Sequence, residues 1–68
     1  MDPKEAIKEF KTAIKYNPGF VQAHNHLALI YLKKNMKKEA LEEFLKVIEL
    51  GPDSQPAKEA KKYLDLIS

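Results

Sequence analysis

Residues 4–18, KEAIKEFKTAIKYNP, return 34 positions later as residues 38–52, KEALEEFLKVIELGP. Seven of the aligned residues are identical, and the phenylalanines and prolines fall at the same places. The chain has 68 residues, so this spacing divides it into two equal lengths. Repeats of such length are typical of arrays in which each unit packs on the next. The sequence therefore predicts stacked units.

Prolines and one asparagine divide the chain into segments of helical length. Breaks are expected at Pro18, at Pro52 with the nearby Pro56, and at Asn35, because Asn tolerates a left-handed backbone in a tight turn. Within each segment, apolar residues recur at three- and four-residue spacing, and no segment shows strand alternation. The predicted helices span about residues 3–16, 20–33, 37–50 and 55–67.

The ends of the predicted helices carry capping signals, and the connections between them are short. Asp2 is expected to cap the first helix, with Pro3 at its first position, and Asp53 or Ser54 to cap the fourth. Connections of two to five residues favour neighbouring antiparallel helices. The expected fold class is all-α, with four helices arranged as antiparallel hairpins.

The second and fourth helices occupy equivalent places in the repeat but differ in polarity. The second is apolar on nearly every side, since Leu27 and Leu29 point in roughly opposite directions. The fourth has one apolar stripe and a charged outer face, which suits the last helix of a stack. We therefore expect an array that closes at its C-terminal end and opens with the second helix of a hairpin, as in an excised or engineered fragment of a longer protein. The charged residues of the fourth helix are Lys58, Lys61, Lys62 and Asp65.

The spacing of the packing residues resembles that of the tetratricopeptide repeat (TPR) family. This chain reads His24-x2-Leu27-Ala28-x2-Tyr31, then Ala40-x3-Phe44, Val47 and Pro52, preceded by Ala6-x3-Phe10, Ala13 and Pro18. His24, Ala28 and Val47 depart from the family's usual aromatic, Gly and Ala. The resemblance implies a superhelical array in a single domain. Its parts are the second helix of a preceding repeat at 1–18, one full repeat at 19–52 and a capping helix at 53–68.

The resemblance further implies a scaffold for protein–protein contact, in which a concave groove holds a peptide or helix of a partner. Periodicity independently finds Leu29 and Leu32 off the main packing face of their helix. An equally weighted alternative is that both leucines pack against the first helix of an adjacent repeat. Carried onto this chain, the groove positions are Gln22, Asn25, His26, Leu29, Leu32 and Lys33.

A second hypothesis is that the chain is a structural fragment that forms homodimers or other homo-oligomers. The first helix lacks the partner helix that would cover its outer side, and apolar residues on the second helix also have an uncovered side. Burying one Leu or Phe is worth roughly 1.5–3 kcal/mol, so covering several can offset the cost of pairing. The residues expected at this contact are Phe10, Ile14, Leu29 and Leu32.

Composition argues against several other classes of protein. Twelve lysines against ten acidic residues give a net charge of +2, and no arginine is present, so nucleic acid and membranes are unlikely partners. Cysteine is absent, which excludes disulfides and thiolate metal sites. Without a signal peptide or an apolar run of membrane-spanning length, a cytoplasmic location is expected.

No arrangement of residues predicts catalysis, a cofactor or a bound metal. His24 and His26 lie about 200° apart on a helix, so they cannot chelate one ion, and a packing role is expected for His24. Glu39, Glu42 and Glu43 are expected on a solvated face beside lysines. The Lys, Asn and Arg clamp by which some family members hold a C-terminal carboxylate is not expected here, because arginine is lacking. The chain is therefore predicted not to be an enzyme.

Overall fold

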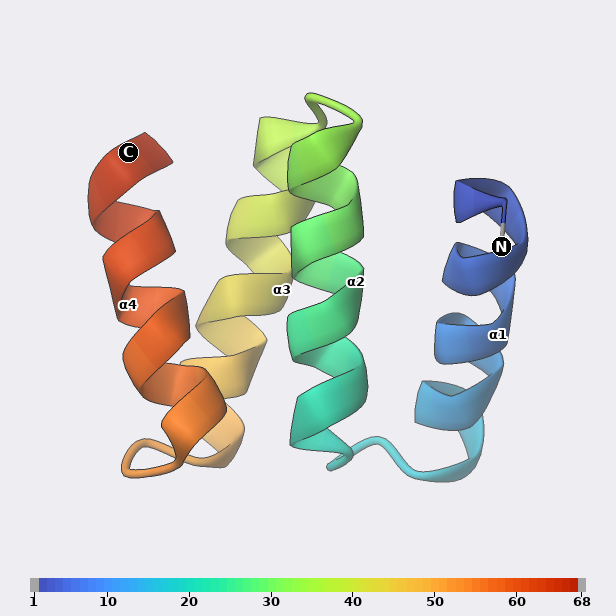
Figure 1. Cartoon of the computed structure of the whole chain (residues 1–68). Helices are drawn as coiled ribbons and strands as arrows, with labels where there is room; N and C mark the ends of the chain where they lie inside the picture. The colour runs from blue at the N-terminus through green and yellow to red at the C-terminus, as the bar shows by residue number, and fades with distance from the viewer. Residues whose placement is uncertain (1, 68) are drawn as a thin grey trace.

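A computed structural model describes residues 2–67 and shows four α-helices joined by short turns (Figure 1). All four lie within one residue of the predicted bounds. None of them is long and apolar enough to cross a membrane. The helices are α1 (Pro3–Tyr16), α2 (Val21–Lys33), α3 (Lys37–Leu50) and α4 (Gln55–Ile67).

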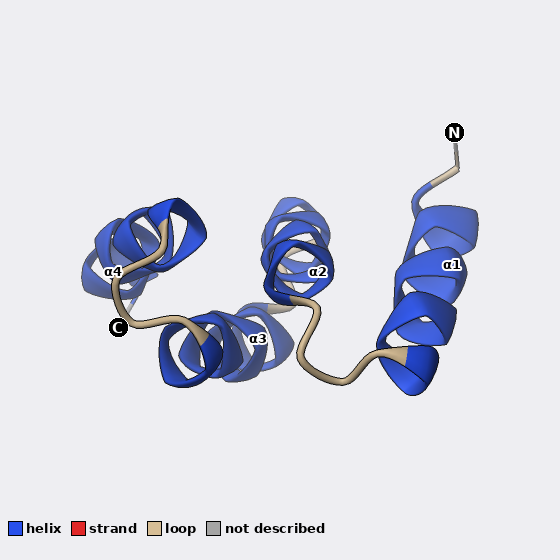
Figure 2. Cartoon of the chain, turned by 90° about the horizontal axis from the view of Figure 1, so that it is seen from below, coloured by secondary structure: helices blue, strands red, loops and turns tan. Residues whose placement is uncertain are grey.

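The helices stack in sequence order and do not close into a bundle. Helix α1 packs on α2 alone, whereas α3 packs on both α2 and α4. Figure 2 shows that α2 and α4 share one side of the molecule and that α3 lies on the other side, between them. The result is a slab of 27 × 25 × 17 Å whose successive antiparallel hairpins form an open array, as the repeat predicts.

The helix ends use the expected capping residues. The Asp2 side chain accepts a hydrogen bond from the Lys4 backbone N–H at 3.0 Å, and Ser54 Oγ accepts one from the Ala57 N–H at 3.2 Å. Ser54, and not Asp53, therefore caps α4. The α2–α3 turn passes through Asn35 with φ 62°, the left-handed conformation that asparagine tolerates.

Gly51 is required by close packing in the α3–α4 turn. The Ser54 hydroxyl donates to the Gly51 carbonyl at 2.6 Å, which draws the turn together. A Cβ at position 51 would lie 3.1 Å from Ser54 Oγ and 3.3 Å from Ser54 Cβ, closer than ordinary contacts. A larger residue at position 51 would require Ser54, which caps α4, to shift by a few tenths of an ångström.

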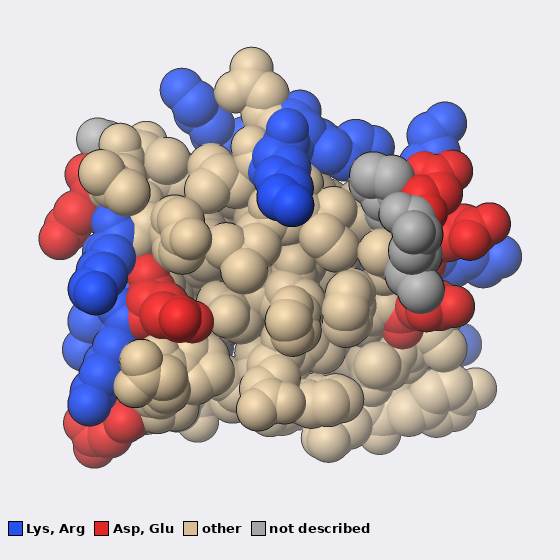
Figure 3. Space-filling view, viewed as in Figure 1, with Lys and Arg blue, Asp and Glu red and all other residues tan. Residues whose placement is uncertain are grey.

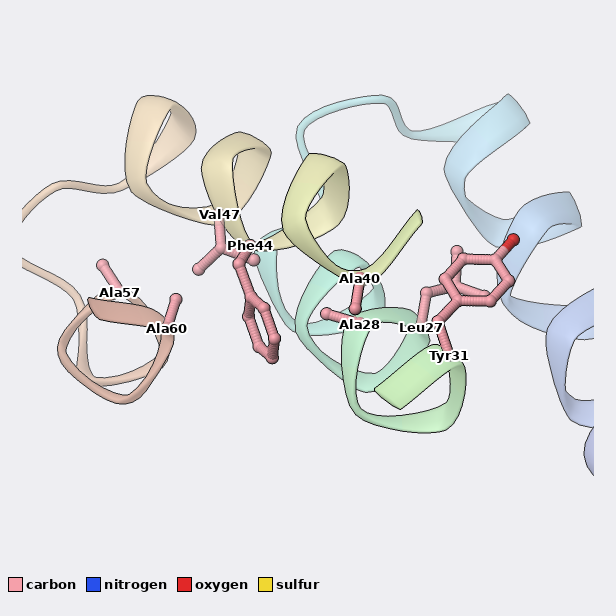
Figure 4. Close-up of a cluster of buried hydrophobic side chains, with 8 residues drawn as sticks. All are labelled: Leu27, Ala28, Tyr31, Ala40, Phe44, Val47, Ala57 and Ala60. Carbon is pink, nitrogen blue, oxygen red and sulfur yellow. The ribbon is translucent and has the colours of Figure 1, made fainter. Parts of the chain in front are cut away.

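The core is a single layer of side chains between α2, α3 and α4 (Figure 4). Ala28 and Ala40 are fully buried, and their small side chains let α2 and α3 approach closely. The ring of Phe44 lies between α2 and α4 and stacks on Tyr63, with ring centroids 5.2 Å apart. The buried cluster consists of Leu27, Ala28, Tyr31, Ala40, Phe44, Val47, Ala57 and Ala60.

The charged positions predicted for the outer face of α4 are all exposed. Its buried residues, Ala57 and Ala60, face α3. Each hairpin of a stack presents an apolar side to the next, and lysines replace that side on α4. Helix α4 therefore exposes its charged face and buries its small residues, as the sequence predicts for the last helix of a stack.

Candidate functional site

A shallow hollow of about 390 Å³ lies on the face formed by α2 and α4. Figure 3 views this face and shows a broad uncharged area that continues to its lower edge, with charged groups at the left and right and basic groups along the top, one of which projects over the upper centre. We refer to this feature as the α2–α4 hollow. It is lined by His26, Leu29, Ile30, Leu32, Lys33 and Tyr63.

The helical repeat of α2 aligns five of the lining residues. His26, Leu29 and Lys33 follow one another at three- and four-residue spacing, so they share one strip of the helix. Ile30 and Leu32 flank this strip and are half-buried. The strip has apolar residues in its middle and a lysine at its C-terminal end, beside the turn to α3.

Aromatic stacking holds the two rings of the hollow in place. Tyr63 enters from α4, and its ring lies nearly parallel to that of the buried Phe44, with an interplanar angle of 7°. His26 stacks on Phe10 of α1, with ring centroids 5.3 Å apart and an interplanar angle of 13°. Because both rings rest on packed aromatic neighbours, the hollow is preformed.

The structure brings four of the six predicted groove residues together, namely His26, Leu29, Leu32 and Lys33. Gln22 is exposed one turn below His26 and does not line the hollow. Asn25 is 7% exposed, and its Oδ1 is buried with no hydrogen-bond partner within the described residues. Asn25 thus lies beneath the surface and is not an accessible groove residue, contrary to expectation.

Sequence reasoning missed Ile30 and Tyr63 as residues of the hollow. Ile30 lies three residues after the buried Leu27, where helical spacing alone does not separate the edge of the packing face from its middle. For Tyr63 a signal existed, because it stands 34 positions after Leu29 and so holds the equivalent place in the next helix of the stack. A groove made by successive first helices includes equivalent positions from both.

His24 and Glu43 form a buried link between α2 and α3. His24 Nδ1 lies 2.7 Å from Glu43 Oε1, and His24 Nε2 lies 3.0 Å from the Pro18 carbonyl oxygen. The imidazole of His24 therefore bridges the Glu43 side chain and the Pro18 backbone. The packing role predicted for His24 agrees with this burial. The prediction for Glu43 was wrong, because its carboxylate turns from solvent toward His24.

Four lysines surround the α2–α3 turn at one end of the hollow. All four are exposed, and none has a carboxylate oxygen within 4.0 Å among the residues that the structure describes. Figure 3 shows basic side chains gathered along the edge where this turn lies. We refer to Lys33, Lys34, Lys37 and Lys38 as the lysine rim.

Two further polar features of residues 2–67 complete the description of the surface. A second hollow, of about 430 Å³, is lined by Glu5, Lys8, Glu9 and Thr12 of α1 alone, so no second element shapes it. Within the described chain, no group of three His, Asp or Glu side chains is placed to hold a metal ion.

Comparison with known proteins agrees with this architecture. The tetratricopeptide repeat family model matches residues 2–62, so the chain belongs to this family. The uncharacterized protein ycf37 of Cyanophora paradoxa is 40% identical over 53 residues, which make up 78% of this chain and 31% of that protein. Hsp70-Hsp90 organizing protein 3 of Arabidopsis thaliana is 42% identical over 48 residues, which make up 71% of this chain and 9% of that protein. No solved structure matches the chain significantly.

The chain therefore spans under a third of either relative that it matches. Tetratricopeptide repeats are scaffold modules that mediate protein–protein interaction and are not an enzyme family. The fold class and the family expected from the repeat are both confirmed.

Proposed function

We propose that this chain captures a segment of a partner protein in the α2–α4 hollow. The segment inserts one apolar side chain between α2 and α4, against Leu29 and Leu32, while its backbone runs along the uncharged face. Recognition of this kind needs an apolar depression with a few polar groups at its edge. His26, Tyr63 and Lys33 supply those groups. The name of the Arabidopsis relative refers to two other proteins, which is in keeping with such a role.

The observation that carries the proposal is the placement of apolar residues outside the core. Leu29 and Leu32 are half-buried and line an open hollow, although the core beside them has fully buried positions. Packing in the core explains why position 27 is a leucine, since Leu27 is 1% exposed. It does not explain why Leu29 and Leu32 are apolar where they line an open hollow. A side chain from a partner would remove the remaining apolar surface from water.

Selection of peptides followed by nuclear magnetic resonance tests the proposal. A displayed library of dodecapeptides is panned against the immobilised chain, and the selected peptides are added to the ¹⁵N-labelled protein. We expect shared apolar residues among the selected peptides and shifts of backbone amides in α2 and α4. Peptides that move only amides of α1, or no amides at up to millimolar concentration, would contradict the proposal.

A pair of matched variants separates loss of binding from loss of folding. Leu29→Glu is expected to abolish peptide binding while the helical circular dichroism signal persists. Leu45→Glu makes the same chemical change on α3, where Leu45 is 57% exposed and lies outside the hollow, and is expected to bind normally. An equal loss of helical signal in Leu29→Glu would identify Leu29 as a core residue instead.

A second candidate function, self-association, is favoured by the incomplete cover of α1. Phe10 and Ile14 are half-buried because α1 packs on α2 alone. The other two residues proposed for this contact, Leu29 and Leu32, line the α2–α4 hollow, which adjoins Phe10 through the stacked ring of His26. Light scattering at high micromolar concentration tests it, since a homodimer doubles the mass and Ile14→Lys would restore the monomer. A monomeric wild-type chain would exclude it.

A further inference from the structure

The charge around the α2–α4 hollow is unevenly distributed. Lys33 is the one lysine among the residues that line the hollow, and it stands at the end of the hollow next to the α2–α3 turn. The other members of the lysine rim follow within five residues. A ligand in the hollow therefore meets apolar walls along its length and a cluster of ammonium groups at one end.

Helix stability accounts for only part of this cluster. The C-terminal end of a helix favours cations, so Lys33 and Lys34 are well placed at the end of α2. The N-terminal end of a helix disfavours cations, yet Lys37 and Lys38 stand in the first turn of α3, where Glu39 is the acidic residue. The Met36 position provides no side-chain cap there. Stabilisation of the two helix ends therefore does not account for Lys37 and Lys38 of the lysine rim.

We infer that the partner segment is acidic on one side of its apolar anchor, with its carboxylates over the lysine rim. This inference rests on the proposed function and adds the chemistry of the ligand. Four exposed ammonium groups with no carboxylate oxygen within 4.0 Å in the described part of the chain attract negative charge, and they lie within reach of a segment anchored at Leu29 and Leu32. Lysines act as mobile point charges, so the carboxylates of Asp or Glu side chains within a longer segment suffice, and no free C-terminus is needed.

The inference is tested with amidated dodecapeptides added to the full-length ¹⁵N-labelled chain. One peptide carries two leucines followed by four glutamates, a second carries the reverse order, and each has versions with glutamine or lysine replacing glutamate. One glutamate order is expected to bind at least tenfold more tightly than its glutamine version. It is expected to shift amides of α2, Tyr63 and residues 34–38 together, and its affinity is expected to fall as salt is raised.

Two variants with equal changes in net charge locate the attraction. Lys33, Lys34, Lys37 and Lys38→Gln removes the rim, whereas Lys4, Lys8, Lys11 and Lys15→Gln removes four exposed lysines of α1. Since an exposed charge pair is worth about 1.5- to fivefold in affinity, loss of four such pairs is expected to weaken binding by at least about fivefold. The control variant is expected to bind within about threefold of the unmodified chain.

Each other outcome has a distinct meaning. Equal binding of the glutamate and glutamine peptides, with shifts in α2 and at Tyr63, would overturn the acidic ligand and leave the proposed function intact. No shift in α2 or at Tyr63 with any peptide would overturn both. Binding of a leucine-free glutamate peptide, or of an oligouridylate, as tightly as the leucine–glutamate peptide would overturn the inference by showing a general anion surface.

Discussion

Two junctions of this molecule have the same residues at their centres and differ in how deeply they bury them. Phe10 in the α1–α2 junction and Phe44 in the α3–α4 junction are equivalent in the 34-residue repeat. Phe44 is 0% exposed, whereas Phe10 is half-buried. The burial of a repeat position therefore depends on how many helices pack around it, because α3 packs on two helices and α1 packs on one.

The residue facing each phenylalanine adds to this difference. Ala60 of α4 is the equivalent of His26 of α2, and Ala60 is fully buried in the layer that holds Phe44. An alanine lets two helices approach, whereas the imidazole of His26 holds the Phe10 ring centroid 5.3 Å away. Both phenylalanines stack on a ring that lines the α2–α4 hollow, Phe10 on His26 and Phe44 on Tyr63, so the first junction differs in lacking a small buried residue opposite its phenylalanine.

The largest expected contrast comes from truncating the two phenylalanines. Phe44→Ala is expected to cost about 3–5 kcal/mol, as is typical of a buried aromatic residue. A chain of this size has about 3–5 kcal/mol of net stability, so this variant should be largely unfolded. Phe10→Ala is expected to cost about half as much and to remain helical. Urea unfolding followed by circular dichroism measures both, and equal losses would contradict the role of neighbouring helices.

Enlarging an alanine tests the same comparison from the opposite direction. Ala40 is 0% exposed between α2 and α3, whereas its repeat equivalent, Ala6, is 9% exposed on α1. Overpacking a filled core typically costs about 1–3 kcal/mol. Ala40→Leu is expected to fall in that range, and Ala6→Leu is expected to cost less because α1 has open space beside it. The midpoint of thermal unfolding is measured for both variants. Equal decreases for Ala40→Leu and Ala6→Leu would contradict the prediction.

Glu43 and Glu9 are also equivalent in the repeat, but only Glu43 has a buried partner. Glu43→Leu would leave one nitrogen of His24 buried without a partner, at a cost of about 1–3 kcal/mol. Glu43→Gln keeps a polar group in place and is expected to lose under about 1 kcal/mol. Glu9→Leu is the control, since Glu9 is exposed. The free energy of unfolding in urea is measured for each variant. Equal losses for Glu43→Leu and Glu9→Leu would contradict a stabilising contact between Glu43 and His24.

The smallest expected contrast concerns the helix caps. Ser54→Ala removes the acceptor for the Ala57 N–H and the hydroxyl that closes the turn at Gly51, so it is expected to cost about 1 kcal/mol. Asp2→Ala removes an exposed cap of α1 and is expected to cost about 0.5 kcal/mol. Urea unfolding of the two variants and of the unmodified chain measures both losses of stability. A larger loss for Asp2→Ala than for Ser54→Ala would contradict the prediction.

Sequence reasoning predicted the elements of this fold more fully than the site. The prolines, Asn35 and the capping residues predicted all four helices, because these signals act within a few residues of the backbone. The 34-residue repeat predicted the stacking order, since equivalent residues make equivalent packing contacts. For the site, the helical period identified Leu29 and Leu32, which line the hollow, but it did not separate Ile30 from the core.

The order of residues along the chain determined its helices, their ends, the polarity of α4 and membership of the repeat family. The helices and their ends follow from helical spacing and turn chemistry, which act within a few residues, and the family follows from the 34-residue repeat along the chain. The tertiary structure decided that Asn25 is covered, that Glu43 turns inward to His24, and that Tyr63 completes the hollow. Each of these depends on side chains from different helices meeting in space, and such distances follow from the packing angle of the stack.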